Sequence, residues 1–163
     1  MKIKNNSIST LYDDDFSLVT WDDNYSTGIL LIDNQHMELI RLTNELFDAC
    51  RGGNDKAESV FKEIIPHMVD YASFHFKTEQ ELMERIQYPD CKNHLLQHDE
   101  LIRDILAAAK DFDEGKKFVP NRFSRTLKTW ILGHVAVYDK AYALFAQDQK
   151  RKGLLPASQL EGL

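Results

Sequence analysis

The chain has 163 residues, of which 43% are hydrophobic and 28% are charged, a size and composition typical of one globular domain. The 26 acidic residues outnumber the 20 Lys and Arg residues and give a formal net charge of -6, so we expect no nucleic acid partner. No apolar run approaches the length of a membrane span, and the first residues lack the apolar core of a signal peptide. We therefore expect a cytoplasmic protein that has no membrane partner.

The pattern of apolar residues predicts a helical domain between two short flanking segments. Residues 1–31 show little helical periodicity, and we expect them to form an arm. Residues 32–150 should form the helices, and residues 151–163 a short tail. The first helix should run from Asp33 to about Arg51, because a pair of glycines that can adopt a left-handed cap conformation follows it.

The second helix should span the longest apolar series of the chain. Asp55, with Glu58 three residues later, has the spacing of a capping box, and the apolar series continues to about Gln87. Pro66 lies inside this series and would remove one backbone hydrogen bond. We therefore expect one kinked helix.

Two further helices should complete the domain. Asp90 is a suitable N-cap for a helix that ends near Asp113, just before Gly115. Pro120 can occupy the first turn of a fourth helix that reaches about Lys150. Four long helices with short connections predict an all-α fold, an antiparallel up-down-up-down four-helix bundle with an N-terminal arm and a short C-terminal tail.

Histidines and carboxylates recur on these helices at spacings that suit metal binding. His75 and Glu79 stand four residues apart, as do His94 and His98. Residues four apart project from one face of a helix and can bind one ion together. His36 lies in the first helix among apolar residues, where an unpaired polar side chain would be costly to bury.

His134 and Asp139 form a less regular pair in the fourth helix. They stand five residues apart, which separates them by about 140° on a regular helix. Asp139 could reach a second metal ion, or the helix could carry a one-residue bulge, a feature that occurs at functional sites.

Together these side chains predict a site for two metal ions. The ligands number seven, more than the four of a structural zinc site. Imidazole and carboxylate without thiolate suit iron, manganese or zinc. The carboxylate-rich Glu-x-x-His pattern of ferritin-like di-iron proteins is absent from the sequence. The candidate ligands are His36, His75, Glu79, His94, His98, His134 and Asp139.

With these residues the chain resembles the bacterial hemerythrins over about residues 20–148. The segments that carry the resemblance are WDDNYSTGILLIDNQH, HFKTEQELM, YPDCKNHLLQH and WILGHVAVYDKAY. The resemblance implies a di-iron centre bridged by oxide or hydroxide. It assigns three ligands to one iron, namely His94, His98 and His134. It assigns His36 and His75 to the other iron, with Glu79 and Asp139 bridging the two.

The resemblance also implies a function, which is reversible O2 binding for carriage, storage or delivery rather than enzymatic catalysis. O2 would be the partner, and azide or a similar small anion would bind in the diferric state. Two alternatives remain open. The chain could be an oxygen or redox sensor that acts through a signalling partner protein, or it could carry out peroxide or nitric oxide chemistry at the open iron.

Helical offsets from the ligands predict the apolar surroundings of the site. Residues four positions from a ligand should lie nearest to it and exclude water. These residues are Ile40, Tyr71, Met83, Ile102 and Trp130. The sixth histidine, His67, has no place in this pattern, and we expect it at the surface.

Overall fold

The computed structural model describes residues 17–155, and within this range it contains helices and no strand. The helical elements are η2 (Asp23–Tyr25), α1 (Leu30–Arg51), α2 (Asn54–Arg85), α3 (Cys91–Asp113), α4 (Val119–Gly133), the π-helical segment η3 (His134–Asp139) and α5 (Lys140–Arg151). No helix in the described range is long and apolar enough to cross a membrane.

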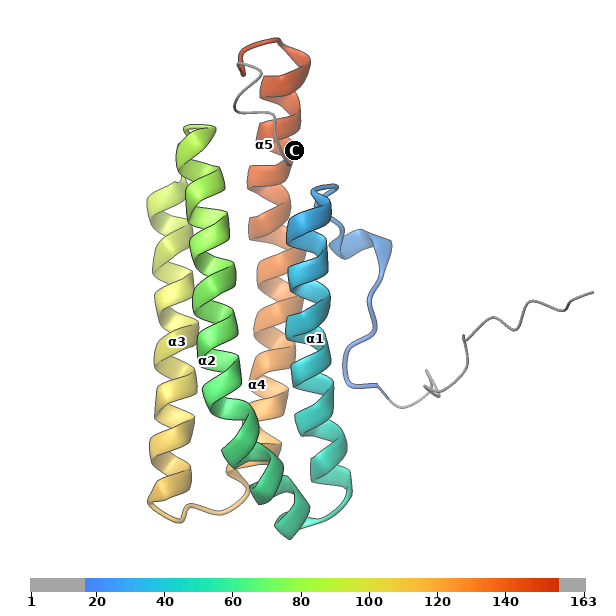
Figure 1. Cartoon of the computed structure of the whole chain (residues 1–163), viewed down its shortest axis with the longest axis vertical. Coiled ribbons are helices and arrows are strands. Elements are labelled where there is room, and N and C mark those ends of the chain that lie inside the picture. The colour runs from blue at the N-terminus through green and yellow to red at the C-terminus, as the bar shows by residue number, and fades with distance from the viewer. Residues whose placement is uncertain (1–16, 156–163) are drawn as a thin grey trace, which may run out of the picture.

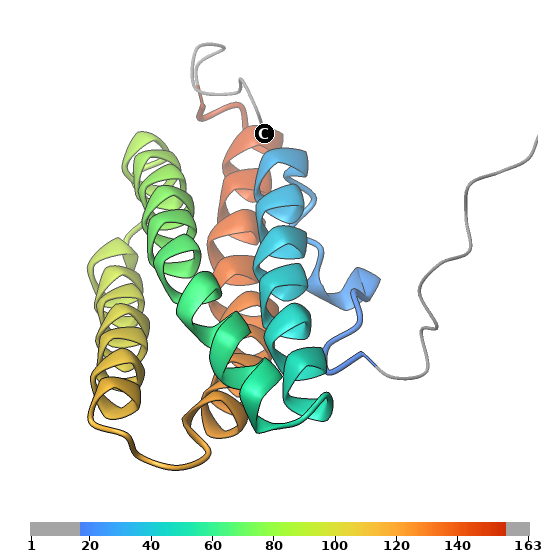
Figure 2. The ribbon, with the colours of Figure 1, turned by 60° about the horizontal axis from the view of Figure 1, so that its bottom comes forward.

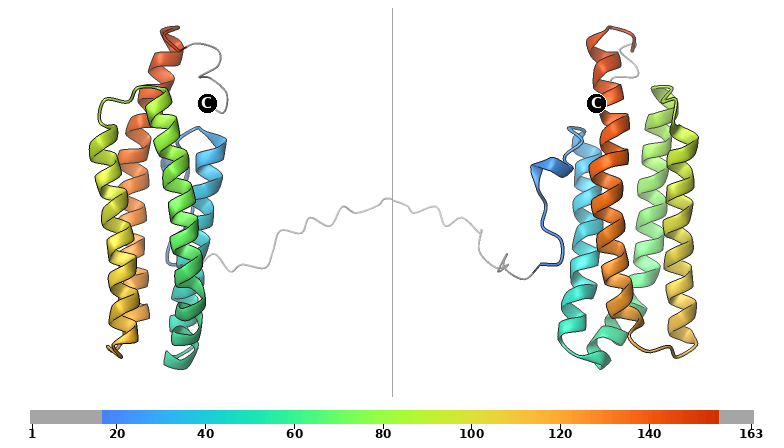
Figure 3. Two further views of the ribbon diagram at one scale, coloured as in Figure 1. Left: turned by 60° about the vertical axis from the view of Figure 1, so that its left-hand side comes forward. Right: turned by 180° about the vertical axis from the view of Figure 1, so that it is seen from behind.

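The helices form the expected antiparallel bundle (Figure 1). The chain reverses direction after each of α1, α2 and α3. The α4 helix, η3 and α5 follow one another as a single rod, which is the fourth helix of the bundle (Figure 3, right). The rod packs against α1 and α3, and α2 packs against the same two helices. The α2 helix and the rod therefore lie on opposite sides of the bundle.

Pro66 lies within α2, which remains one helix from Asn54 to Arg85. Its N-terminal part bends away from the axis of the rest (Figure 2), as expected for a proline that interrupts the backbone hydrogen bonds. The predicted capping box of Asp55 and Glu58 is wrong, because no side chain caps this helix. The helix begins one residue earlier, so that Asp55 lies in its first turn, where a carboxylate still favours the helix dipole.

The α1 helix begins at Leu30, three residues before the expected start at Asp33. The Asp33 carboxylate instead fixes the preceding turn. Its oxygens accept hydrogen bonds from the Ser26 hydroxyl, the Thr27 hydroxyl and the Thr27 backbone N–H, each at 2.7 Å. Burial opposes ionisation of Asp33, but these three bonds outweigh it and lower the pKa of the carboxyl. The start of α1 is thus joined to the arm by charge-assisted hydrogen bonds.

The arm, represented in the structure from residue 17, lies alongside α1 and the α4–η3–α5 rod (Figures 2 and 3). The Asn44 side-chain amide forms two hydrogen bonds with the backbone of Val19. It accepts one from the Val19 N–H at 2.9 Å and donates one to the Val19 carbonyl at 2.8 Å. The Lys140 ammonium donates to the carbonyl of Asn24 at 2.9 Å. The arm therefore contacts both α1 and the first residue of α5.

The apolar core is divided into two clusters. The upper cluster, near the start of α1 in Figure 1, consists of Ile29, Ile32, Leu82, Met83, Ile86, Tyr142, Ala143 and Ala146. The larger, lower cluster fills the rest of the bundle. On α1 the clusters are separated between Ile32 and Leu39, and on α2 between Phe76 and Leu82. One layer of the bundle interior is therefore occupied by something other than aliphatic packing.

Replacing Asp33 with Ala should lower the free energy of unfolding by about 2 kcal/mol, the value of one or two charge-assisted hydrogen bonds. Because the pKa of Asp33 is lowered in the folded protein, its contribution is complete above the unfolded pKa of about 4 and is lost as the pH falls below it. Urea unfolding at neutral and acidic pH measures the effect. Asp48→Ala, at an exposed position of the same helix, should change little, and an equal loss for both variants would contradict the role of Asp33.

Candidate metal centre

The layer between the two apolar clusters is filled by the seven side chains that the sequence singles out. Two belong to α2, two to α3, one to α1 and two to η3. None is more than 3% exposed. They are His36, His75, Glu79, His94, His98, His134 and Asp139. Residues spread over 104 positions of the chain thus meet at one level of the bundle, in a dry interior.

Three of the imidazoles form a compact triangle. The Nε2 atoms of His94 and His98 are 3.0 Å apart, those of His98 and His134 are 3.0 Å apart, and those of His134 and His94 are 3.2 Å apart. Two neighbouring donors of an octahedral ion with bonds of about 2.1 Å lie about 3.0 Å apart, whereas two donors of a tetrahedral ion lie about 3.4 Å apart. The triangle has the dimensions of one face of an octahedral ion.

The donor atoms divide into two groups that share both carboxylates. The three-histidine group contains His94, His98 and His134, and the two-histidine group contains His36 and His75; Glu79 and Asp139 belong to both groups. Within each group, the donor atoms all lie within 4.8 Å of one another. The arrangement suits two adjacent cations with two carboxylates between them.

The Asp139 carboxylate faces both groups. One of its oxygens lies 3.1 Å from His134 Nε2, and the other lies 3.0 Å from His36 Nε2. The Glu79 carboxylate is similarly placed, with Oε2 3.1 Å from His98 Nε2 and 3.5 Å from His75 Nε2.

The π-helical segment η3 explains how His134 and Asp139 reach the same site. A π-helical turn links residues five apart, and His134 and Asp139 are the first and last residues of η3. Of the two explanations that the sequence left open, the structure contains the one-residue bulge. Because the bulge turns Asp139 towards the interior, this side chain is fully buried.

Several buried polar atoms of the cluster form no hydrogen bond within the described residues. Both ring nitrogens of His36, Oε2 of Glu79 and both carboxylate oxygens of Asp139 form no hydrogen bond in the described part of the protein. The ion-pair partners of Glu79 and Asp139 there are all histidines. Such atoms are costly to bury unless a cation binds them, so the donor set fits bound metal.

The charges of the cluster shift the pKa values of its members. Burial opposes ionisation of Glu79, but the surrounding imidazoles, with His75 the strongest, hold its pKa well below the usual range. Burial likewise disfavours a protonated His36, yet the carboxylates of Asp139 and Glu79 raise its pKa to about 10. The same balance raises the pKa of His94 to about 9. Burial and the charge of Glu79 oppose ionisation of Asp139, but the imidazoles of His134 and His36 outweigh them and lower its pKa. Both carboxylates are therefore anionic at neutral pH and require positive charge beside them.

Hydrogen bonds from outside the cluster orient its members. Gln97 Oε1 lies 3.0 Å from His134 Nδ1, and Gln35 Oε1 lies 2.9 Å from His75 Nδ1. An amide oxygen can only accept, so each Nδ1 carries a proton and each Nε2 keeps its lone pair directed into the cluster. The buried Tyr142 hydroxyl donates to Glu79 Oε1 at 2.6 Å.

These orienting residues were not predicted. Gln35 and Gln97 each directly precede a predicted ligand, yet glutamine is an ordinary residue of helix surfaces. Tyr142 belongs to an apolar stripe, and its position three residues after Asp139 is the one signal that could have indicated its role.

Aromatic rings cover the three-histidine group. Trp130 stacks on His134 with ring centroids 4.2 Å apart, and Phe76 stacks on His98 at 3.8 Å. Trp130 is thus where the helical offset predicts it. Phe76 was not predicted, because it directly follows His75 and serves a different ligand across the bundle.

The other predicted neighbours occupy the two apolar clusters. Ile40 is buried in the lower cluster and Met83 in the upper one. Tyr71 and Ile102 are partly buried at the edge of the lower cluster. His67 is exposed, as expected.

Comparison with known proteins identifies relatives of this fold and site. Residues 27–144 match the model of the hemerythrin HHE cation binding domain. A bacteriohemerythrin of Stenotrophomonas maltophilia is 32% identical over 78% of this chain and 80% of its own length. A bacteriohemerythrin of Methylococcus capsulatus is 28% identical over 77% of this chain and 95% of its own. A crystal structure of wild-type hemerythrin superposes with a TM-score of 0.70 at 28% identity, over 78% of this chain and 96% of that one.

Removing metal from the protein should lower its melting temperature. A cation that binds only the folded bundle adds about 4 kcal/mol at 1,000 times its Kd, so ferrous iron added to the stripped protein without oxygen should restore the higher melting temperature. Calorimetry provides the measurement. The exposed His67→Ala variant should respond as the unmodified protein does, whereas His98→Ala should respond less. An unchanged melting temperature on addition of iron would show that the cluster does not bind it.

Proposed function

This chain belongs to the hemerythrin family, and we propose that it is an oxygen-binding protein which holds two iron ions between its helices and binds O2 reversibly, without acting as an enzyme. The observation that carries the proposal is the sharing of Glu79 and Asp139 between two groups of buried imidazoles. One ion would lie in the three-histidine group and the other in the two-histidine group, with the two carboxylates bridging them.

The donor set and its spacing support iron over structural zinc. Imidazole and carboxylate ligands without a thiolate leave iron, manganese and zinc as candidates. The spacing of about 3 Å between the Nε2 atoms of the three-histidine group matches an octahedral ion better than the tetrahedral geometry of structural zinc. Ferrous iron, when bound, supplies the electrons that O2 binding requires.

The protein's own residues would keep the site rigid and dry. The upper and lower clusters close the layer from both ends, while Phe76 and Trp130 cover the imidazoles of His98 and His134. The Tyr142 hydroxyl occupies one lone pair of Glu79 Oε1 and so limits the rotation of this carboxylate. Excluding water protects the ferrous state. We propose the same water-excluding role for Ile40, Tyr71, Met83 and Ile102.

The unequal number of histidines provides an open position on one side of the site. Both groups share the two carboxylates, but one group supplies three imidazoles and the other supplies two. An octahedral ion in the two-histidine group would therefore keep one more position free of protein ligands. An open position distinguishes a reactive metal site from a structural one, so we assign O2 binding to the side of His36 and His75.

One observation favours a second candidate function, that of an oxygen or redox sensor. Lys140 directly follows Asp139, and its ammonium donates to the Asn24 carbonyl in the arm. A change of charge at the metal centre could thus reach the arm and a signalling partner. Reversible oxygenation of the ferrous protein over repeated cycles, followed by its visible spectrum, supports oxygen carriage, whereas rapid irreversible oxidation supports sensing.

The folded protein should contain two iron atoms per chain after growth with ample iron, because the seven ligands complete one binuclear site. Elemental analysis of the purified protein gives this ratio directly. One iron per chain, or zinc in place of iron, would refute the proposed centre. His67→Ala should leave the ratio at two, since this side chain lies at the surface.

In a crystal structure of the azide complex of the diferric protein, the anion should lie beside His36 and His75, where the open position is expected. His36→Ala should abolish reversible O2 binding because it removes a ligand on that side, and His67→Ala should leave O2 binding intact. Azide found beside His94, His98 and His134 would overturn the assignment of the open side.

A further inference from the structure

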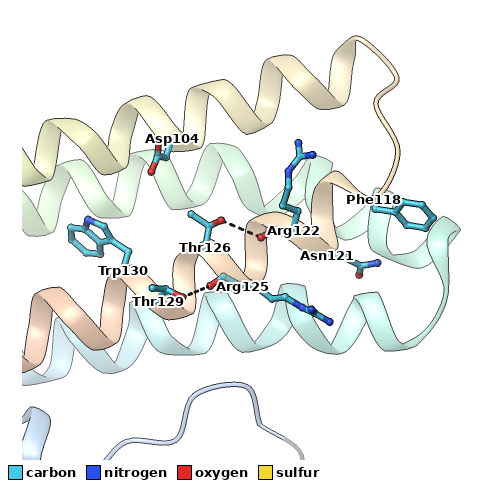
Figure 4. A pocket seen from close by; sticks show the side chains of 8 residues that line it. All are labelled: Asp104, Phe118, Asn121, Arg122, Arg125, Thr126, Thr129 and Trp130. Atoms are coloured by element: carbon cyan, nitrogen blue, oxygen red, sulfur yellow. Dashed lines mark hydrogen bonds between the residues drawn. The ribbon is translucent and has the colours of Figure 1, made fainter.

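A shallow groove of about 760 Å³ runs along the outer side of α4, next to α3. Figure 4 shows Trp130 at one end of the groove, between α4 and the Asp104 side chain of α3, and Phe118 at the other end. Phe118 is 63% exposed and has a φ of 60°, the left-handed region that side chains rarely adopt. A bulky residue held in this backbone conformation is uncommon and motivates a hypothesis of function for the surface around it.

The groove is connected to the metal centre through stacked rings. Trp130 lines the groove and stacks on His134 at 4.2 Å with an interplanar angle of 13°. The Tyr138 ring lies on His134 as well, with centroids 5.6 Å apart, and Tyr138 is 43% exposed. One ligand of the three-histidine group is therefore in contact with two aromatic rings that reach the surface.

The charge of this part of the chain differs from that of the rest. Residues 115–138 contain five Lys and Arg residues and no acidic residue, although the whole chain has a net charge of -6. Asp111 pairs with Lys116 and Arg122. The side chains of Arg125 and Lys128, in contrast, form no ion pair within the described residues. The outer surface of α4 thus presents uncompensated positive charge on a molecule that is otherwise acidic.

We infer that the Trp130 groove is the docking surface of an acidic protein that donates electrons one at a time and restores the ferrous state of the centre after oxidation. This inference rests on the proposed function, because an oxygen-binding iron protein that loses electrons needs a route for their return. The stacked rings of Trp130 and His134 provide the route, and the acid-free surface of α4 selects the partner by charge.

The electron count of the reaction is simple. Each donor molecule loses one electron, so two encounters supply the two electrons that convert a pair of ferric ions to ferrous ions. One proton from water would accompany them and offset part of the negative charge that they add to the buried layer. Because the donor must leave after each transfer, a small and weak interface suits this task, and a shallow charged groove suits it better than a large apolar one.

Charge variants of the groove test the docking surface. A reduced plant-type [2Fe–2S] ferredoxin, whose potential is about -400 mV, serves as the acidic probe, and stopped-flow absorbance follows reduction of the diferric protein. At low salt Arg125→Glu should slow reduction about tenfold, and Asp104→Lys should accelerate it, because Asp104 is the acidic side chain on the α3 wall of the groove. High salt should reduce both effects.

Lys77→Glu is the matched control, since Lys77 is 76% exposed on α2, on the side of the bundle opposite the rod. It should reduce at the rate of the unmodified protein. Equal rates for all three variants, or equal slowing by Lys77→Glu and Arg125→Glu, would exclude the groove as the docking surface.

Two further measurements separate docking from changes at the metal centre. The cationic methyl viologen radical should not be slowed by Arg125→Glu; slowing with both donors would mean that the variant damages the centre, and would overturn the inference. The chain has two tryptophans, so addition of oxidised ferredoxin should shift the indole N–H signal of Trp130 and not that of Trp21. Oxygen binding by the unmodified protein is measured separately, and its absence would count against the proposed function alone.

Discussion

The structure depends on two carboxylates that are buried with no Lys or Arg of residues 17–155 beside them. Glu79 and Asp139 are fully enclosed, and their polar neighbours in the described range are imidazoles and the Tyr142 hydroxyl. An isolated buried carboxylate costs several kcal/mol even after relaxation of the protein. Positive charge must therefore enter the layer with the fold, and the proposed pair of metal ions would supply it. On this proposal the stability of the bundle and its chemistry would rest on the same ions.

This polar layer also shapes the helices around it. The apolar core is interrupted at the same level on α1, on α2 and on the α4–η3–α5 rod, so that each of them has an apolar segment, one or two cluster residues and a second apolar segment. The fourth helix of the bundle meets this requirement by a local change of geometry. Regular α-helical spacing would turn Asp139 away from His134, and η3 corrects the direction with one extra residue. The helix departs from α-helical geometry only over η3, where the cluster requires Asp139, and it is α-helical again in α5.

Spacing along the helices predicted most of the fold and all seven residues of the cluster. Ligands four residues apart must share a face, and the five-residue spacing of His134 and Asp139 allowed only a bulge or a second metal, of which the structure contains the bulge. Contacts across the bundle could not be predicted in this way. Tyr142 reaches Glu79 on α2 from α5, and Phe76 covers a histidine of α3, because these pairings depend on helix rotation and packing. Helix ends were predicted to within three residues. The roles of Asp33 and Asp55 were not predicted, because a contact with the arm and an earlier helix start decided them.

Because Glu79 and Asp139 belong to both donor groups, loss of different residues of the cluster would have unequal effects. A mutation of His36 or His75 removes one donor from the two-histidine group and leaves the five donors of the three-histidine group in place. A mutation of Glu79 or Asp139 removes a donor from both groups at once. Sequence drift could therefore convert such a bundle into a mononuclear protein through the loss of a histidine, in small and separately tolerable steps. Loss of either carboxylate offers no such intermediate, because it weakens both donor groups in one step. The two acidic residues therefore link the fate of the two proposed metal sites.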